Sequence, residues 1–269
     1  MYLFILCSHS SGSTALWRLL QTSPHAAGLP VEGQHIEAVQ AVMRQAPWNE
    51  GYQPPWPAVK AEWHKFWDGH KAILLEKSPP NLVRALAIEE AFEPACFVVM
   101  VRDPYAFCEG TKRRGRAGMG YRPGATYRQI AEGWARESRL QMKNIAELKR
   151  VSWLTYERLS DDPAGASQQL LHFLPQLERL DVASSFHIHS AQGWLSRPIT
   201  NLNRQQIAHL SSADIAEINA GLKDHADVMA FFGYSHLEQA YPWPVRWRLG
   251  WSELFTKYVT RNWQRLSGS

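Results

Sequence analysis

The chain has 269 residues, of which 45% are hydrophobic and 20% charged, and its formal net charge is +4 at pH 7. The length allows one large domain with its own core, and the longest apolar run falls short of the roughly 18 residues that a membrane span needs. The pI near 9.0 favours anionic ligands, but no basic run is long enough to predict a nucleic-acid-binding arm.

Short apolar runs alternate along the chain with longer segments of helical periodicity. We expect strands at 2–7, 72–76, 96–101 and 151–155, and helices at 13–22, 80–92, 104–113, 125–149, 163–174 and 211–232. Because these strands are apolar on both faces, they suit a parallel sheet covered by helices. The sequence therefore predicts an α/β three-layer sandwich with a central parallel sheet. No strand is expected in 28–70, and the basic, glycine-rich segment 113–124 is predicted to be a mobile loop.

The first candidate site is the segment SHSSGST, which joins the strand at 2–7 to the following helix. Such a turn gathers backbone N–H groups at a helix N-terminus, where anions bind because these donors have no partner within the helix. Gly12 allows close approach of the backbone, while Ser13 and Thr14 either donate from their hydroxyls or cap the helix. ATP- and GTP-binding loops carry a lysine after the glycine, and here Ser13 takes that place. A capped turn with no ligand is the alternative interpretation.

Two further strands end in cationic side chains. Glu76-Lys77-Ser78-Pro79 follows one strand, and Arg102-Asp103-Pro104 follows the next. In an open α/β sheet, ligands bind at the carboxyl ends of the strands, so both cations are expected near the SHSSGST loop. A single cation at such a place is often a surface ion pair, whereas two that converge on an anion-binding loop indicate a functional site.

Taken in order, these segments resemble the sulfotransferase family, whose members use 3′-phosphoadenosine-5′-phosphosulfate (PAPS). The resemblance covers roughly residues 1–235. Within the family, the chain is similar to the bacterial, glycan and tyrosylprotein sulfotransferases. It rests on SHSSGSTALWRLL, EKSPPNL, VVMVRDPYAFCEGTKRR, WLTYERLSDDP with the helix QQLLHFL, and FFGY. The resemblance implies a P-loop NTPase-like sulfotransferase fold.

The resemblance also implies roles for individual residues. The 5′-phosphate and the sulfate would be bound by Ser8, His9, Ser10, Ser11, Gly12, Ser13 and Thr14. Arg102 would bind the 3′-phosphate, Tyr156 would lie near the adenine, and Arg197 in the late loop would add a 3′-phosphate contact. A sulfonate donor would explain the missing loop lysine, because there is no triphosphate to hold.

Two positions depart from the family pattern. Ser10 stands where members commonly carry Arg or Lys, and Gly110 stands where they carry a serine that follows the arginine. Thr111 is a candidate substitute for that serine, and His9 for the lost loop charge. Lys77 is therefore expected to supply the charge at the transferring group.

Sulfuryl transfer to a hydroxyl needs charge stabilisation on the sulfate oxygens and a base for the acceptor proton. The resemblance assigns Lys77 to the first task and Glu32 to the second, with His35 as the reserve base. A solvated loop carboxylate is the alternative for Glu32, and a structural histidine at a helix start is the alternative for His35. No metal is expected, since the donor sulfate carries less charge than a triphosphate tail, and the histidines in HIH at 187–189, without a third ligand, are read as structural.

Aromatic residues concentrate in two segments. Trp63, Phe66 and Trp67 in the first segment have helical spacing, which favours core packing over an aromatic pocket for the acceptor. The second segment, 241–269, is basic and aromatic and is expected to form a helical extension to a sulfotransferase domain at 1–240. This extension would dock on its own domain, contact a membrane surface or mediate dimerisation.

The sequence thus predicts a cytoplasmic, PAPS-dependent sulfotransferase acting on a hydroxyl of a carbohydrate or small molecule, with PAP (3′-phosphoadenosine 5′-phosphate) as the second product. The cytoplasmic location rests on three cysteines that suggest buried thiols, and on an N-terminus that begins directly in a strand instead of a signal peptide. Two alternatives stay open: a P-loop kinase, and a catalytically inactive PAP-binding or membrane-surface protein.

Overall fold

A computed structural model describes residues 1–116, 124–190 and 193–241, and the side chains of 187–190, 193–195 and 197 are outside this description. The strands are β1 (Tyr2–Cys7), β2 (Ala26–Gly28), β3 (Ile73–Glu76), β4 (Ala95–Val101), β5 (Val151–Thr155), β6 (Phe186–Ser190) and β7 (Gly193–Arg197). The α-helices are α1 (Ser13–Leu20), α2 (Glu37–Arg44), α3 (Trp56–Trp63), α4 (Ala85–Ala91), α5 (Pro104–Arg116), α6 (Tyr127–Glu147), α7 (Tyr156–Asp161), α8 (Pro163–Phe173), α9 (Asn203–Ile207), α10 (Ser212–Leu222) and α11 (Ala226–Phe231). Short 3-10 turns are η1 (Gly33–His35), η2 (Pro79–Val83) and η3 (Pro175–Leu177).

The central sheet has five strands in the order β2-β3-β1-β4-β5, and every pairing in it is parallel. β1 lies in the middle and pairs over its whole length with β4, from Tyr2 opposite Ala95 to Cys7 opposite Met100. Because all strands run the same way, their carboxyl ends meet at one edge of the sheet. A separate antiparallel hairpin is formed by β6 and β7.

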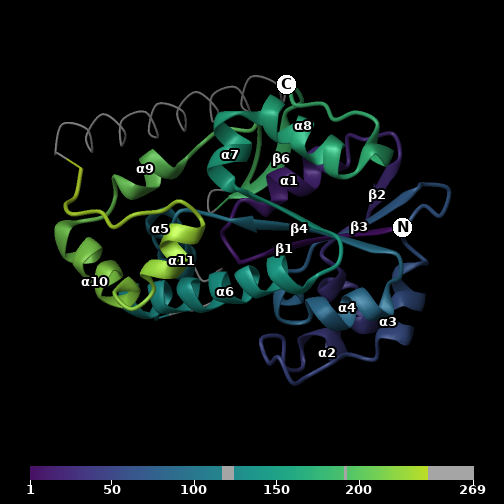
Figure 1. Cartoon of the computed structure of the whole chain (residues 1–269), viewed down its shortest axis with the longest axis horizontal. Helices are drawn as coiled ribbons and strands as arrows, with labels where there is room; N and C mark the ends of the chain where they lie inside the picture. The colour runs from purple at the N-terminus through teal and green to yellow at the C-terminus, as the bar shows by residue number, and fades with distance from the viewer. Residues whose placement is uncertain (117–123, 191–192, 242–269) are drawn as a thin grey trace, which may run out of the picture.

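Helices cover both faces of the sheet, which gives the predicted three layers (Figure 1). Leu3 and Ile5 of β1 pack on the side of α1, α7 and α8, whereas Phe4 and Leu6 pack on the side of α4 and α6. All four side chains are fully buried. This alternation is what a strand buried on both faces requires, and it confirms the α/β sandwich predicted from the apolar runs.

Several predicted boundaries are wrong. The sequence analysis missed β2, whose three residues are too few to show a period, and it ended α5 at 113 although the helix continues to Arg116. The predicted helix at 80–92 begins with the 3-10 turn η2, and the one at 211–232 divides into α10 and α11. The remainder of the predicted loop at 113–124, residues 117–123, lies outside the described residues.

The tryptophans of the first aromatic segment belong to the core. Trp56, Trp63 and Trp67 are each at most 6% exposed, and Trp63 packs against Phe92 with ring centroids 5.5 Å apart. Their indole N–H groups donate hydrogen bonds to neighbouring oxygens, as buried indoles must. Core packing is therefore confirmed for Trp63 and Trp67, but it is wrong for Phe66, which is 50% exposed.

The basic aromatic segment predicted as a C-terminal extension begins at 241, and residues 242–269 lie outside the described residues. Within the described part, no helix is both long and apolar enough to cross a bilayer. The three cysteines, all described, are buried, and no disulfide joins them.

Candidate active site

Each strand of the sheet is followed, at its carboxyl end, by a residue that the sequence analysis singled out. β1 leads into the SHSSGST loop and β2 leads toward Glu32, while Lys77, Arg102 and Tyr156 come directly after β3, β4 and β5. Since the strands are parallel and adjacent, the fold brings these five segments together at one edge. β2 therefore has a functional consequence, because it places Glu32 beside the strand that carries Lys77.

The SHSSGST loop makes a tight turn before α1. Ser10 and Gly12 both have left-handed backbone conformations, with φ of 61° and 83°. No side-chain hydrogen bond caps the N-terminus of α1 in the described structure, so neither Ser13 nor Thr14 acts as a cap. The first backbone N–H groups of the helix therefore lack a side-chain acceptor, and an anion placed there would receive them.

Arg102 links the first loop to the end of β4. The side chain is 6% exposed, and its Nη1 donates to the carbonyl oxygen of Ser10 at 3.0 Å. Nε donates to Asn203 Oδ1 at 2.8 Å and Nη2 donates to Gln206 Oε1 at 2.6 Å. No ion pair joins Arg102 to a carboxylate in the described residues. Its positive charge is thus held by uncharged acceptors and stays available to an anionic ligand.

Tyr156 lies between the loop and Arg102. The Arg102 guanidinium stands 4.1 Å from the ring centroid, and a Cβ at Gly12 would come within 2.5 Å of the ring. The hydroxyl donates to the carbonyl oxygen of Thr200 and accepts from the backbone N–H of Leu202. With only 5% of its surface exposed, Tyr156 packs between the SHSSGST loop and Arg102 and holds them in place. A contact with adenine stays a prediction.

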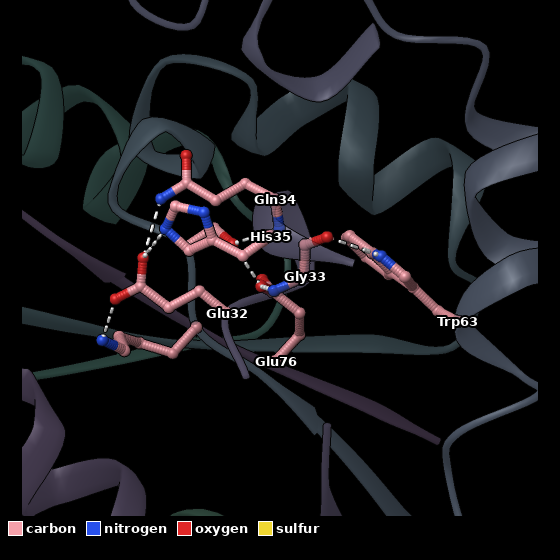
Figure 2. Close-up of polar contacts among 8 residues, drawn as sticks. Glu32, Gly33, Gln34, His35, Trp63 and Glu76 are labelled. Carbon is pink, nitrogen blue, oxygen red and sulfur yellow. Dashed lines mark hydrogen bonds and ion pairs between the residues drawn. The ribbon is translucent and has the colours of Figure 1, made fainter. Parts of the chain in front are cut away.

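Glu32 and Lys77 form an ion pair, and Glu32 is surrounded by further polar groups (Figure 2). Lys77 Nζ donates to Glu32 Oε1, while Gln34 Nε2 donates to Oε2 at 2.7 Å. His35 Nε2 lies 3.7 Å from the same Oε2. Burial by itself would raise the pKa of Glu32, but the charge and hydrogen bond of Lys77, with that of Gln34, lower it below its usual value. The carboxylate is therefore ionised at neutral pH and able to accept a proton.

A second carboxyl group fixes the turn that carries Glu32. Glu76 is 1% exposed and accepts hydrogen bonds from the backbone N–H of Gly33, at 2.9 Å, and from the hydroxyl of Ser78 and the amide of Asn81. Burial raises the pKa of Glu76 to about 7. On the other side of the turn, Trp63 Nε1 donates to the carbonyl oxygen of Gly33 at 3.2 Å. Figure 2 shows Gly33 between Glu76 and Trp63, so the turn is held from both sides.

Residues 3–178 match the model of the sulfotransferase family. The chain belongs to the sulfotransferase family. The matched range contains all five strand ends described above and stops before β6. No protein with a curated description matches the sequence. Membership of the family makes the protein a transferase and supports sulfuryl transfer as its reaction.

One solved sulfotransferase domain shares the fold, and two further solved structures are similar at lower TM-scores. The sulfotransferase domain from the curacin biosynthetic pathway is 19% identical, with 87% of this chain and 98% of that chain aligned at a TM-score of 0.52. A sulfotransferase from Alicyclobacillus acidocaldarius is 16% identical, over 87% and 96% of the two chains, at a TM-score of 0.47. Retinol dehydratase, solved with androsterone and the inactive cofactor PAP, is 11% identical over 84% and 69%, at a TM-score of 0.37.

Gly110, one of the two departures from the sulfotransferase pattern, and its candidate substitute Thr111 differ in their surroundings. A Cβ at Gly110 would lie 3.9 Å from Ser10 Cβ and 3.6 Å from Gln206 Nε2, so this position does face the loop. Thr111, by contrast, is 2% exposed, and its hydroxyl is buried without a hydrogen-bond partner in the described structure. The role of Thr111 as a substitute stays a prediction. The side chain of Arg197 lies outside the described residues, and its contact with the 3′-phosphate stays a prediction.

Four residues near the site were not predicted from the sequence. Asn203 and Gln206 bind Arg102 from α9, about a hundred positions away, and no local pattern indicates this pairing. Arg114, in the last turn of α5, has its pKa lowered by burial and by the charges of Arg113 and Arg102, while Glu32 opposes this shift. The ring of half-buried Trp48 lies 5.5 Å from that of His9. Of these four residues, only Arg114 lies in a segment that stood out in the sequence, the basic run at the end of α5.

Proposed function

We propose that the protein transfers the sulfuryl group of PAPS to a hydroxyl of a carbohydrate or another small molecule. The observation that carries the proposal is the gathering of an uncapped helix N-terminus, Arg102 and the Glu32–Lys77 pair at the ends of adjacent parallel strands. A donor with a phosphate at each end of a nucleoside and a sulfate at the reacting end matches this distribution of cationic and N–H donors.

In this proposal the SHSSGST loop and the first turn of α1 bind the 5′-phosphate and the sulfate, and Arg102 binds the 3′-phosphate. Lys77 Nζ leaves Glu32 to donate to a sulfate oxygen, which stabilises the charge that develops during transfer. The exchange replaces one anionic partner of a buried cation by another, so Lys77 stays paired throughout. Positioning and charge stabilisation supply most of the rate in such displacements.

Glu32 acts as the base. The acceptor oxygen attacks the sulfur in line, the bond from sulfur to the 5′-phosphate oxygen breaks, and the hydroxyl proton passes to Glu32. The products are the sulfate ester and PAP. Gln34 donates to Oε2 of the carboxylate, so that the other oxygen is turned toward Lys77. His35 is the reserve base, because it lies beside Glu32 and its side chain is 44% exposed.

The kinase alternative requires a strand-end aspartate for Mg²⁺. Asp103 instead accepts hydrogen bonds from the backbone N–H groups of Tyr105 and Ala106, both at 2.9 Å, and so caps α5. These contacts favour the sulfotransferase over a kinase.

Nucleotide binding and labelled transfer test the proposal. Isothermal titration calorimetry compares PAP with ATP, each with and without Mg²⁺, and we expect PAP to bind in either buffer and ATP to bind weakly. Transfer of radiolabelled sulfate from PAPS into an extract of small molecules then identifies the acceptor. Tight Mg²⁺-dependent ATP binding without PAP binding would favour the kinase. PAP binding without transfer to any acceptor would favour an inactive nucleotide-binding protein.

A further inference from the structure

The surface of α5 that faces the SHSSGST loop has a position without a side chain. Gly110 lies there, and the group closest to where its Cβ would be is the carboxamide of Gln206, with Nε2 at 3.6 Å and Oε1 at 3.9 Å. Ser10 Cβ follows at 3.9 Å. The Gln206 side chain therefore reaches from α9 to the space that a side chain at position 110 would otherwise fill.

The orientation of this carboxamide is fixed by Arg102. A guanidinium only donates hydrogen bonds, so the oxygen of Gln206, and not its nitrogen, accepts from Arg102 Nη2 at 2.6 Å. The NH₂ group is then the part of the carboxamide not bound to Arg102, and it lies 3.6 Å from the Cβ position of Gly110. Within residues 1–116, 124–190 and 193–241, this NH₂ group donates to no acceptor. The NH₂ group of Gln206 is therefore a half-buried donor beside Arg102, whose hydrogen-bond acceptors carry no charge.

The NH₂ group of Gln206 and the guanidinium of Arg102 together suit an oxyanion better than a neutral ligand group. A phosphate offers three acceptor oxygens and one to two negative charges, so it can take a hydrogen bond from the amide while it neutralises Arg102. A ribose hydroxyl can accept from the amide, but it leaves the buried charge of Arg102 without an anionic partner. The arrangement therefore distinguishes a phosphorylated ribose from an unphosphorylated one.

We propose that Gln206 is a specificity-determining residue that donates from Nε2 to the 3′-phosphate of the nucleotide, at the place left open by Gly110. This inference rests on the proposed function, because it takes PAPS as the donor. Gln206 thereby makes the preference for a 3′-phosphorylated nucleotide depend on α9, a helix that lies outside the range matched by the family model.

Arg102 keeps its orientation without Gln206. Asn203 also holds Arg102, and it is itself anchored, since its Nδ2 donates to Glu157 Oε1. Glu157 in turn accepts from the backbone N–H of Asp103 at 3.0 Å and from the hydroxyl of Tyr234 at 2.8 Å. A substitution at Gln206 therefore removes one donor to the ligand while Asn203 and the Ser10 carbonyl keep the guanidinium in place.

The test compares PAP with 5′-AMP, which lacks the 3′-phosphate, by calorimetry on the full chain. Gln206→Leu keeps the volume and removes the amide, and we expect it to weaken PAP binding about tenfold while 5′-AMP binding changes less than about twofold. Gln206→Glu places a carboxylate beside the phosphate and should weaken PAP binding at least about a hundredfold. Gln205→Leu, on the same helix, is the matched control and should change neither affinity. Adding Gly110→Ser to Gln206→Leu supplies a hydroxyl at the open position and should restore part of the preference for PAP.

The outcomes separate this inference from the proposed function. If the wild type prefers PAP to 5′-AMP and Gln206→Leu keeps the same ratio, the inference is wrong and the proposed function stands. An equal loss of both affinities would mean that Gln206 only supports the loop, which also overturns the inference. If the wild type binds no PAP, both fail. Should Gln206→Leu melt at a lower temperature than the control, Gln206→Met, which also lacks the amide, replaces it in the same comparison.

Discussion

At the scale of single residues, the pairing of Glu32 with Lys77 decides how the site can work. Lys77 is 6% exposed, so its charge needs an anionic partner, and Glu32 supplies one. The same pairing lowers the pKa of Glu32 and keeps it ionised. The sequence analysis predicted both residues but not their contact, because they are 45 positions apart and belong to different strand ends.

Glu32→Gln should separate catalysis from binding. The amide keeps the shape and, through its single oxygen, the hydrogen bond from Lys77, but its NH₂ group no longer accepts from Gln34 and cannot take the acceptor proton. We expect kcat to fall by about 10² to 10⁴, with the Kd for PAP changed less than about threefold. Single-turnover transfer of labelled sulfate and calorimetry measure the two quantities. Glu37→Gln, an exposed position on α2, is the control, and unchanged turnover in Glu32→Gln would assign the base elsewhere.

Glu76 should make the stability depend on pH. Its pKa is about 7 in the folded protein, against 4.5 for an ordinary glutamate, so the folded state binds more protons between these values. The free energy of unfolding therefore decreases as pH rises from about 4.5 to 7, by up to about 3 kcal/mol from this residue. Glu76→Gln removes this contribution, and its amide can donate to Asn81 Oδ1, which is buried without a partner in the described structure.

Urea denaturation at pH 5, 6, 7 and 8 checks this prediction. The difference in unfolding free energy between wild type and Glu76→Gln should shift in favour of the variant as pH rises through about 7. Glu90→Gln, on the exposed side of α4, serves as the control and should give a constant difference. A constant difference for Glu76→Gln as well would contradict the raised pKa.

At the scale of elements, each short connection after a strand carries part of the site. The turn before α1 needs a left-handed residue at Gly12, and Tyr156 from the start of α7 closes against it. Local sequence identifies such a turn, since a strand, small polar residues, a glycine and a helix occur in order. It does not identify β2, although that strand, through the turn held by Glu76 and Trp63, places Glu32 next to β3.

Gly12→Ala should loosen this turn. The left-handed conformation costs an alanine about 1 to 2 kcal/mol, and its Cβ would lie 2.5 Å from the Tyr156 ring, which must then move. Because the ring also contacts Arg102, we expect PAP binding to weaken at least about tenfold. Calorimetry and urea denaturation measure both effects. Gly69→Ala, where a Cβ meets nothing within 4 Å, is the control, and equal affinities in the two variants would contradict the role of the turn.

At the scale of the whole molecule, the ligand should stabilise the fold because its groups contact the ends of several strands. PAP at about one hundred times its Kd adds about 2.7 kcal/mol to the free energy of unfolding, which corresponds to a rise in Tm of roughly 5 to 10 °C. Thermal melts with increasing PAP measure this rise. Arg102→Ala should abolish most of it, whereas Arg139→Ala, which breaks an exposed ion pair with Asp227, should leave it intact. An equal rise in both variants would show that Arg102 does not contact the ligand.

The amino-acid sequence by itself determined most strands of the central sheet and the residues that stand at their ends. Apolar runs of strand length and helical periodicity are local properties, so four of the five sheet strands, the SHSSGST turn and the cations at Lys77 and Arg102 could be predicted. Only the tertiary structure decided the strand order, the contact of Glu32 with Lys77 and the approach of Gln206 to Arg102, which is 104 positions away. The physical reason is that such pairings depend on how helices and strands pack in space, and packing leaves no period in the local sequence.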